Sequence, residues 1–183
     1  MSAPFLYRAW VLASRCLIPF AASAEARKLN AQDVPAARAG EKRGIATQPR
    51  PSGGPLVWVH AASVGESLSV LTLIARMGDR LPQAQFLITS GTATSAQLIA
   101  RRMPPRTRHQ FAPLDAPGPG GRVLSHWRPD AAIFVESEIW PQMLRRTHAT
   151  GAPMALVNAR MSDKTVEFWE KWPRTARYLF DVF

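Results

Sequence analysis

Short apolar runs alternate with helix-length segments along the chain after residue 55. Apolar runs bounded by turn-forming residues predict buried strands. The predicted strands are Leu56–His60, Gln85–Thr89, His109–Ala112, Ala131–Val135 and Met154–Asn158. The predicted helices are Ser67–Leu81, Thr94–Met103, Gly120–Trp127, Trp140–His148 and Lys164–Phe183. Such alternation predicts an α/β fold, a Rossmann-like doubly wound parallel sheet with right-handed crossovers and helices on both faces.

The N-terminal segment Pro4–Ala22 is apolar but is interrupted by Arg8 and Arg15, which share nearly one face of a helix. A transmembrane helix needs about 20 apolar residues, and an arginine near its centre costs at least ~2.5 kcal/mol. We therefore expect residues 1–24 to form an amphipathic, membrane-associated helix that lies in the interface. The small residues at Ala21–Ala24 leave a signal peptide as the alternative.

Residues 25–54 are rich in Ala, Arg, Gly and Pro and show little apolar periodicity. This composition predicts a basic surface segment that ends in a linker at Gln48–Pro55. The compact domain is then expected to occupy residues 55–183.

The loops that follow the predicted strands are polar, and parallel sheets bind ligands outside the carboxyl ends of their strands. The candidate ligand-binding residues in these loops are Ser63, Gly65, Glu66, Thr89, Thr92, Glu136, Glu138, Asn158 and Arg160. Together they predict a site for a polar ligand that bears hydroxyl groups. Carboxylates at such an edge can act as general bases, or they can simply complement a helix dipole. Asn158 and Arg160 can bind an anion or brace the sheet.

The chain has 183 residues and a net charge of +10, from 23 basic and 13 acidic side chains. The sequence lacks a recognisable nucleic-acid-binding signature, so we expect no nucleic-acid partner. An anionic membrane surface and a phosphorylated substrate explain the charge equally well. The single cysteine excludes an internal disulfide, and the four histidines lack metal-ligand spacing.

Four motifs, in this order, resemble the N-terminal domain of the 3-deoxy-D-manno-octulosonic acid (Kdo) transferases, glycosyltransferases of lipopolysaccharide assembly. They are Val57–Glu66, Pro113–Asp115, Val135–Pro141 and Val157–Ser162. The resemblance implies the N-terminal half of a GT-B type enzyme at the cytoplasmic face of the inner membrane. This half would bind a lipid A precursor as acceptor, and a C-terminal half would bind the donor, CMP-Kdo.

The resemblance also assigns chemical roles. It implies that Glu66 deprotonates the attacking sugar hydroxyl and that Glu138 supports the transition state, in an inverting direct displacement without metal or other cofactor. Ala93 and Ser95 replace a proline and a glycine of the family's threonine-rich turn. Because the sequence stops at Phe183, before any donor-binding domain, we expect this chain alone to bind acceptor without transferring sugar.

Two alternatives remain open at this point. One is a truncated, non-catalytic membrane-surface module that binds lipid A phosphates. The other is a different GT-B glycosyltransferase, because a fold does not fix a function.

Overall fold

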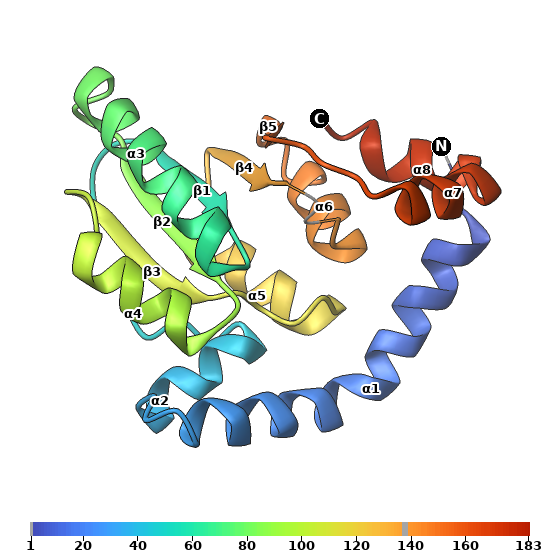
Figure 1. Ribbon diagram of the computed structural model, residues 1–183, viewed down its shortest axis with the longest axis horizontal. Coiled ribbons are helices and arrows are strands. Elements are labelled where there is room, and N and C mark those ends of the chain that lie inside the picture. Colours follow the sequence, from blue (N-terminus) through green and yellow to red (C-terminus); the bar gives the residue numbers. More distant parts are fainter. Residues whose placement is uncertain (1, 137–138) are drawn as a thin grey trace.

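The computed structural model describes residues 2–136 and 139–183 (Figure 1). Five strands form one parallel sheet in the order β3-β2-β1-β4-β5. The strands are β1 (Leu56–His60), β2 (Gln85–Ser90), β3 (Thr107–Phe111), β4 (Ala131–Val135) and β5 (Met154–Val157). All five lie within two residues of their predicted positions. The order reverses between β1 and β4, as in a Rossmann-like sheet, so the predicted fold class is confirmed.

Two pairs of helices cover the two faces of the sheet. Strand side chains alternate between the faces, so Val57 and Ile88 pack with α3 and α4, whereas Trp58 and Phe134 pack with α5 and α6. These helices are α3 (Val64–Arg80), α4 (Ala93–Arg102), α5 (Pro117–Trp127) and α6 (Pro141–His148). The sheet is therefore buried on both faces, and only its ends and edges are available to a ligand.

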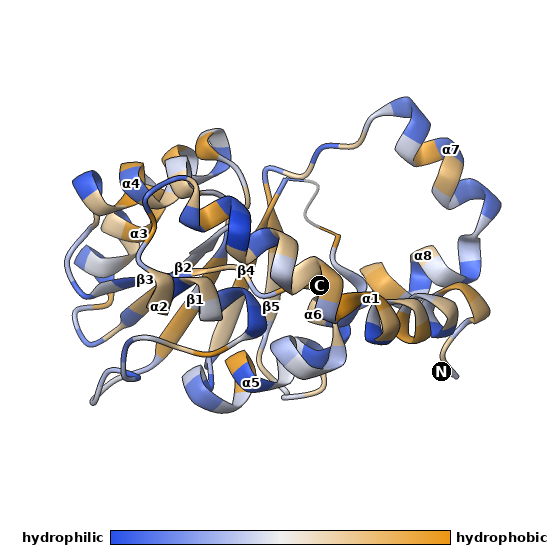
Figure 2. Cartoon of the chain, turned by 90° about the horizontal axis from the view of Figure 1, so that it is seen from below, coloured by the Kyte–Doolittle hydropathy of each residue, from blue (hydrophilic) through white to orange (hydrophobic). Residues whose placement is uncertain are grey.

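The N-terminal helix α1 (Phe5–Asn30) is longer than expected and runs along one side of the domain (Figure 1). By length and composition it could cross a membrane. One face, which includes Ser14 and Leu29, is buried against the domain. Figure 2 shows apolar residues along the helix, and Phe5 and Phe20 are about three-quarters exposed. The helix thus exposes both apolar and basic side chains on its outer side and is packed against the domain on its inner side.

Residues 25–54, expected to be a basic surface segment that ends in a linker, are partly packed into the domain. It contains α2 (Ala36–Ala39) and the short 3₁₀ helix η1 (Gly40–Arg43). Glu41 is fully buried, and its carboxylate accepts hydrogen bonds from the backbone N–H of Phe111 at 2.7 Å and from the Arg38 guanidinium at 3.0 and 3.1 Å. The structured domain therefore includes residues on the N-terminal side of position 55.

The predicted C-terminal helix is two helices, α7 (Asp163–Lys171) and α8 (Pro173–Phe180). Pro173 cannot continue a helix because it lacks an N–H and its ring collides with the preceding turn, so it begins a new one. No side chain of α7 is buried, and Figure 2 shows this helix standing away from the sheet. In contrast, α8 packs on the domain through Thr175 and Leu179.

Candidate functional site

The candidate site lies at the carboxyl ends of β1 and β4, which are neighbours in the sheet. The chain leaves β1 toward the face covered by α3 and leaves β4 toward the face covered by α6, so the loops after these two strands diverge. Open α/β sheets bind ligands at such a reversal of strand order. The predicted residues Glu66 and Glu136 follow β1 and β4 respectively. The fold therefore brings these two loops to the same edge.

Glu66 is held in place by its own helix terminus. The Ser63 hydroxyl accepts a hydrogen bond from the Glu66 backbone N–H at 3.2 Å, which caps α3. One oxygen of the Glu66 carboxylate, Oε2, accepts from the Ala62 backbone N–H at 2.9 Å. The residue is only 8% exposed. The carboxylate thus has a fixed orientation in the first turn of the helix, where the helix dipole favours its charge.

The residues around Glu66 are more open. Ser63 and Gly65 are exposed at the start of α3. A Cβ atom placed on Gly65 would have the Ser63 hydroxyl as its nearest neighbour, at 4.0 Å. The glycine is therefore not required by internal packing, and its lack of a side chain leaves room for a ligand beside Glu66.

The two predicted threonines serve the structure of the edge itself. Thr89 is fully buried, and its hydroxyl contacts the Trp58 indole N–H and the His60 Nδ1 atom, both at 2.9 Å. Thr92 caps α4 and forms a reciprocal capping box with Ser95. Thr89 lies below the surface of the site, whereas Thr92 is half-buried and sets the start of α4.

Glu136 and Asn158 meet at the ends of β4 and β5. The Asn158 side-chain amide donates to Glu136 Oε1 at 3.2 Å. Both residues have a left-handed backbone, with φ of 56° and 52°, which is uncommon for residues other than glycine. Such conformations concentrate at functional sites, where the surrounding structure sustains them. Arg160 is exposed two residues after Asn158, and Glu138 lies outside the described residues.

Comparison with known proteins places this arrangement in a family. Residues 37–183 match the family described as 3-deoxy-D-manno-octulosonic-acid transferase (kdotransferase). The chain belongs to the Kdo transferase family. A Kdo transferase from Rickettsia bellii is 42% identical over 116 residues, which cover 63% of this chain and 28% of that protein. A probable mitochondrial Kdo transferase from Arabidopsis thaliana is 36% identical over 129 residues, 70% of this chain and 29% of that protein.

A Kdo transferase from Haemophilus influenzae is more distant, at 27% identity over 128 residues, again 70% of this chain and 29% of that protein. The matched part thus spans less than a third of the length of these relatives. The family match begins at residue 37, within α2, which agrees with the packing of α2 and η1 into the domain.

Sequence reasoning left Asp115 off the list of site residues of this Kdo transferase domain, although it follows β3. Its buried carboxylate accepts from the backbone N–H groups of Gln142 at 3.2 Å and Met143 at 2.8 Å. It therefore caps α6, the helix that begins soon after β4. It also accepts from the Trp10 indole N–H at 2.6 Å. Burial raises the pKa of this carboxyl, and these three donors oppose the rise.

A buried lysine connects the N-terminal segment with the loops of the site. Lys42 Nζ donates to the Gly91 carbonyl at 2.7 Å and lies 3.6 Å from a carboxylate oxygen of Glu25. The Gly91 N–H in turn donates to the Ala62 carbonyl at 2.9 Å. Burial lowers the pKa of this ammonium. The sequence around Lys42 contains several charged residues, but this pattern does not predict that Lys42 is buried.

Within the described ranges, no group of three or more His, Cys, Asp and Glu side chains is placed to hold a metal ion. The predicted residues at this edge offer carboxylates, hydroxyls, an amide and a guanidinium.

Proposed function

We propose that this chain forms the acceptor-binding part of a glycosyltransferase that moves Kdo from CMP-Kdo to a lipid A precursor. The observation that carries the proposal is the position of Glu66 just after β1, where the strand order reverses between β1 and β4, in a chain of the Kdo transferase family. In the family resemblance, the glutamate of this motif is the base.

The reaction proposed for this site is one inverting displacement. Glu66 takes the proton of the attacking acceptor hydroxyl, the hydroxyl oxygen bonds to the anomeric carbon of Kdo, and CMP departs with the bonding electrons. The hydrogen bond from Ala62 to Oε2 fixes the direction in which the carboxylate points. A base needs such positioning within hydrogen-bonding reach of the proton that it removes. Glu138 would support the transition state from the loop after β4.

The other candidate residues would bind the acceptor. Ser63 and Gly65 border the base, while Glu136, Asn158 and Arg160 offer hydrogen bonds and a positive charge to hydroxyls and phosphates. Thr89 and Thr92 would contribute through the shape of the loop after β2 rather than through the buried Thr89 hydroxyl. No metal or other cofactor is required by this proposal.

The packing of α1 supports a position of this helix in the plane of an anionic membrane surface, and the resemblance implies that this is the cytoplasmic face of the inner membrane. Trp10 and Ser14 hold the helix to the domain through hydrogen bonds of 2.6 Å with Asp115 and Gln142. A helix so attached cannot cross the bilayer without drawing these polar contacts into hydrocarbon, which is costly. Its exposed Phe5 and Phe20 can enter the interface instead.

The substitution Glu66→Gln in the intact protein, expressed from its complete gene, tests the assignment. The glutamine carbonyl can still accept from the Ala62 N–H, so the loop is preserved while the base is lost. Kdo transfer is expected to fall about 10²–10⁴-fold, with acceptor binding nearly unchanged. Asp79→Asn, at the exposed far end of the same helix, should leave both unchanged. Unimpaired transfer by Glu66→Gln would exclude Glu66 as the base.

A donor screen on the same preparation separates the alternatives. Transfer from another nucleotide sugar in preference to CMP-Kdo would indicate a different GT-B glycosyltransferase. Acceptor binding without transfer from any donor would indicate a non-catalytic module.

A further inference from the structure

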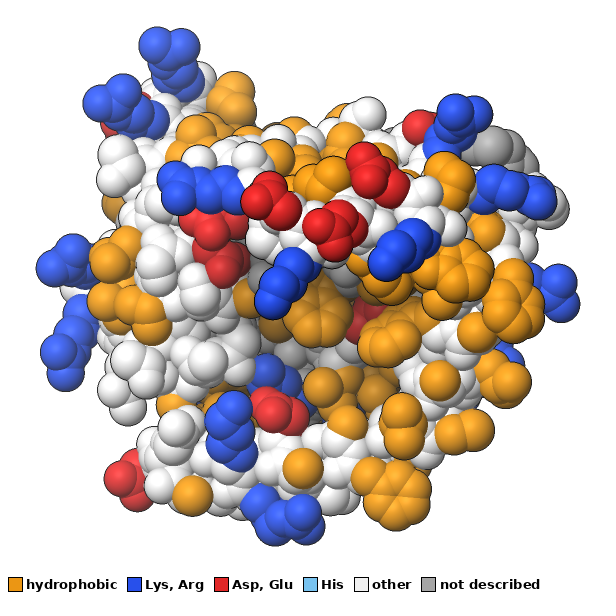
Figure 3. Space-filling view, turned by 45° about the vertical axis from the view of Figure 1, so that its right-hand side comes forward, with side chains coloured by type: hydrophobic (Ala, Val, Ile, Leu, Met, Phe, Trp, Pro, Cys, Tyr) orange, Lys and Arg blue, Asp and Glu red, His pale blue; other side chains and the backbone are white. Residues whose placement is uncertain are grey.

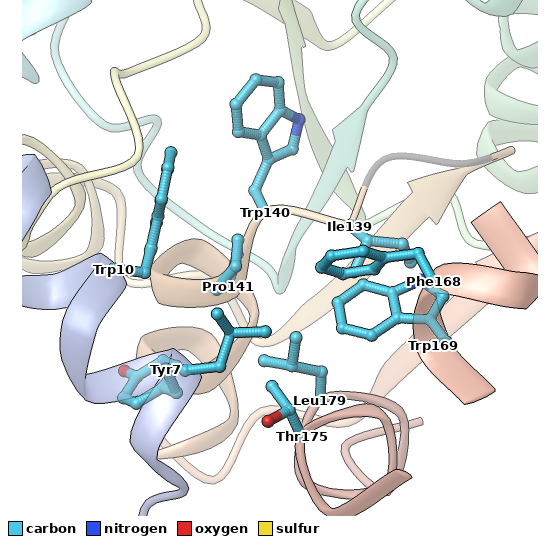
Figure 4. Close-up of a pocket in the computed structure, with 10 residues that line it drawn as sticks. Tyr7, Trp10, Ile139, Trp140, Pro141, Phe168, Trp169, Thr175 and Leu179 are labelled. Atoms are coloured by element: carbon cyan, nitrogen blue, oxygen red, sulfur yellow. The ribbon is translucent and has the colours of Figure 1, made fainter. Parts of the chain in front are cut away.

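An apolar cavity of about 280 Å³ lies beside the candidate site, between α1, the start of α6, and the pair α7 and α8 (Figure 4). Trp10 of α1, Trp140 before α6 and Trp169 of α7 contribute three of its walls, and Leu179 of α8 lies at its base. Its size is near the lower end for sites that take small organic molecules. Figure 3 shows hydrophobic side chains around a hollow on this part of the surface.

The lining of the cavity suits a hydrocarbon. Its described walls are aromatic and aliphatic apart from the Thr175 and Tyr7 hydroxyls, and no charged side chain is among them. Burying a sugar or a phosphate against such walls would leave its polar groups without hydrogen bonds, and each such group would cost roughly 2–7 kcal/mol. Burying a methylene contributes favourably, by about 0.8 kcal/mol.

One polar atom of a wall residue is buried and lacks a partner among the described residues. The indole Nε1 of Trp169 is buried and has no hydrogen-bond partner in the part of the chain that the structure describes. Buried donors without a partner are rare in native proteins. A shift of the Trp169 ring that exposed Nε1 to the cavity would let it donate to the ester or amide carbonyl of a fatty acyl group.

The surroundings of the cavity match an anionic acylated lipid. A neighbouring hollow shares Leu6 and Thr175 with the cavity and is lined also by Lys171 and Arg174. Positive charge next to an apolar cavity complements a ligand that combines acyl chains with phosphates. The cavity wall at residues 139–141 follows the loop after β4, so an acyl chain held here keeps its polar headgroup near the candidate site.

We propose that this cavity binds one fatty acyl chain of the lipid acceptor and thereby positions the acceptor headgroup at the site. This inference rests on the proposed function for the identity of the acceptor. It assigns to Leu6, Trp169 and Phe168 a role in recognising the acyl chain.

Quenching of tryptophan fluorescence by a bromine-labelled dodecanoic acid, at concentrations below its micelle threshold and without vesicles, tests the cavity in the intact protein. Trp10, Trp140 and Trp169 line the cavity, whereas Trp58 and Trp127 are buried against the sheet. The probe is expected to quench the cavity tryptophans saturably.

The variant Leu6→Glu places a charge on the cavity wall and should weaken probe binding at least about tenfold. The matched control Leu12→Glu lies on the exposed side of the same helix and should bind the probe as the wild type does. Phe168→Ala is a second variant. Its side chain is 44% exposed, so its loss should leave the fold intact while weakening binding several-fold.

Wild-type affinity in both Leu6→Glu and Phe168→Ala would overturn the proposal. An absence of quenching in the wild type would also overturn it, because it would mean that the probe does not enter the cavity, for example because another part of the intact protein fills it. Equal loss of quenching in Leu6→Glu and Leu12→Glu would also overturn it, because it would indicate adsorption to the helix surface only.

Transfer kinetics separate this inference from the proposed function. With an acylated acceptor, Leu6→Glu should raise KM several-fold and leave kcat unchanged, whereas KM for the de-acylated disaccharide should not change. An unchanged KM for the acylated acceptor would overturn the acyl site even though Kdo transfer persists. Saturable, Leu6-dependent probe binding without any Kdo transfer would instead support the acyl site and refute the proposed function.

Discussion

Acidification is expected to destabilise the domain through His109, a buried residue of β3. Arg38 Nη2 contacts His109 Nδ1 at 2.7 Å, and a guanidinium can only donate, so Nδ1 is the unprotonated ring nitrogen. The Nε2–H therefore donates to the Ser90 hydroxyl at 2.8 Å. A second proton on the ring would point toward the guanidinium. Burial, with the nearby charges of Arg38 and Lys42, lowers the pKa of His109 from 6.5 to about 3.

The direction and size of the effect follow from this pKa difference. Between pH 6.5 and 3 the unfolded chain binds more protons at this position than the folded chain does, so folding stability falls as pH falls. The contribution is complete above pH 6.5. Each pKa unit corresponds to about 1.4 kcal/mol, so the loss is about 2 kcal/mol at pH 5 and about 4–5 kcal/mol near pH 3. Even the smaller loss is a sizeable fraction of the stability of a typical domain.

Urea unfolding between pH 7.5 and 4.5 measures this loss. The variant His109→Gln can present a carbonyl oxygen to Arg38 and an amide N–H to Ser90 without titrating, so it should lose about 2 kcal/mol less than the wild type on moving to pH 5. His148→Gln alters an exposed histidine and should keep the wild-type pH dependence. Parallel curves for His109→Gln and the wild type would refute the reasoning.

Two further substitutions test contacts that hold the site. Trp10→Phe removes a donor from the buried Asp115 carboxylate and should lower the free energy of unfolding by about 1.5–3 kcal/mol at pH 7. Because burial raises the pKa of Asp115, this penalty should shrink as acid protonates the carboxyl, and an equal penalty in urea titrations at pH 7 and pH 4 would contradict this account. Gly91→Ala would place its Cβ 2.9 Å from the Ala62 carbonyl oxygen and should cost about 1–3 kcal/mol in thermal unfolding. In the control Gly121→Ala, the added Cβ would have its nearest contact at 3.5 Å, with the flexible side chain of Arg146. A similar loss of stability in this control would show that steric strain does not cause the loss in Gly91→Ala.

The sheet could be predicted from the sequence because each strand is a short apolar run between turn-forming residues. The first and fourth strands match their predicted bounds. The strand β3 begins two residues earlier than expected, because its first two residues are polar and an apolar pattern does not detect them. The prediction of one long C-terminal helix overlooked Pro173. The break between α7 and α8 could have been predicted from Pro173 alone, since proline is favoured in the first turn of a helix and excluded from its interior.

The packing of the N-terminal segment could not be predicted from local patterns. Glu41 and Lys42 have charged side chains in a segment rich in Ala, Gly and Arg, a composition typical of a solvated surface. Each of them has a partner more than 45 residues away in the sequence, Phe111 for Glu41 and Gly91 for Lys42. A side chain whose partners come from tertiary structure leaves no periodic signal.

The candidate site was predictable to the extent that it follows from topology. The sequence predicts that Glu66 and Glu136 follow strands, and the strand order brings these strands together. The sequence does not show whether a side-chain hydroxyl at a strand end is exposed or buried. Thr89 is the last residue of its predicted strand, yet its side chain points into the core, where its hydroxyl forms hydrogen bonds with Trp58 and His60.

The contacts of Asp115 suggest that α1 and the site can be separated mechanically. Asp115 is bonded twice to the backbone of α6, at Gln142 and Met143, but only once to α1, through Trp10. A displacement of α1 on a lipid surface would therefore break the Trp10 contact, together with the hydrogen bond between Ser14 and Gln142, before it disturbed the cap of α6. The start of α6 and the loop after β4 would keep their positions. The cavity beside the site has α1 as one wall, so its width should depend on the position of this helix.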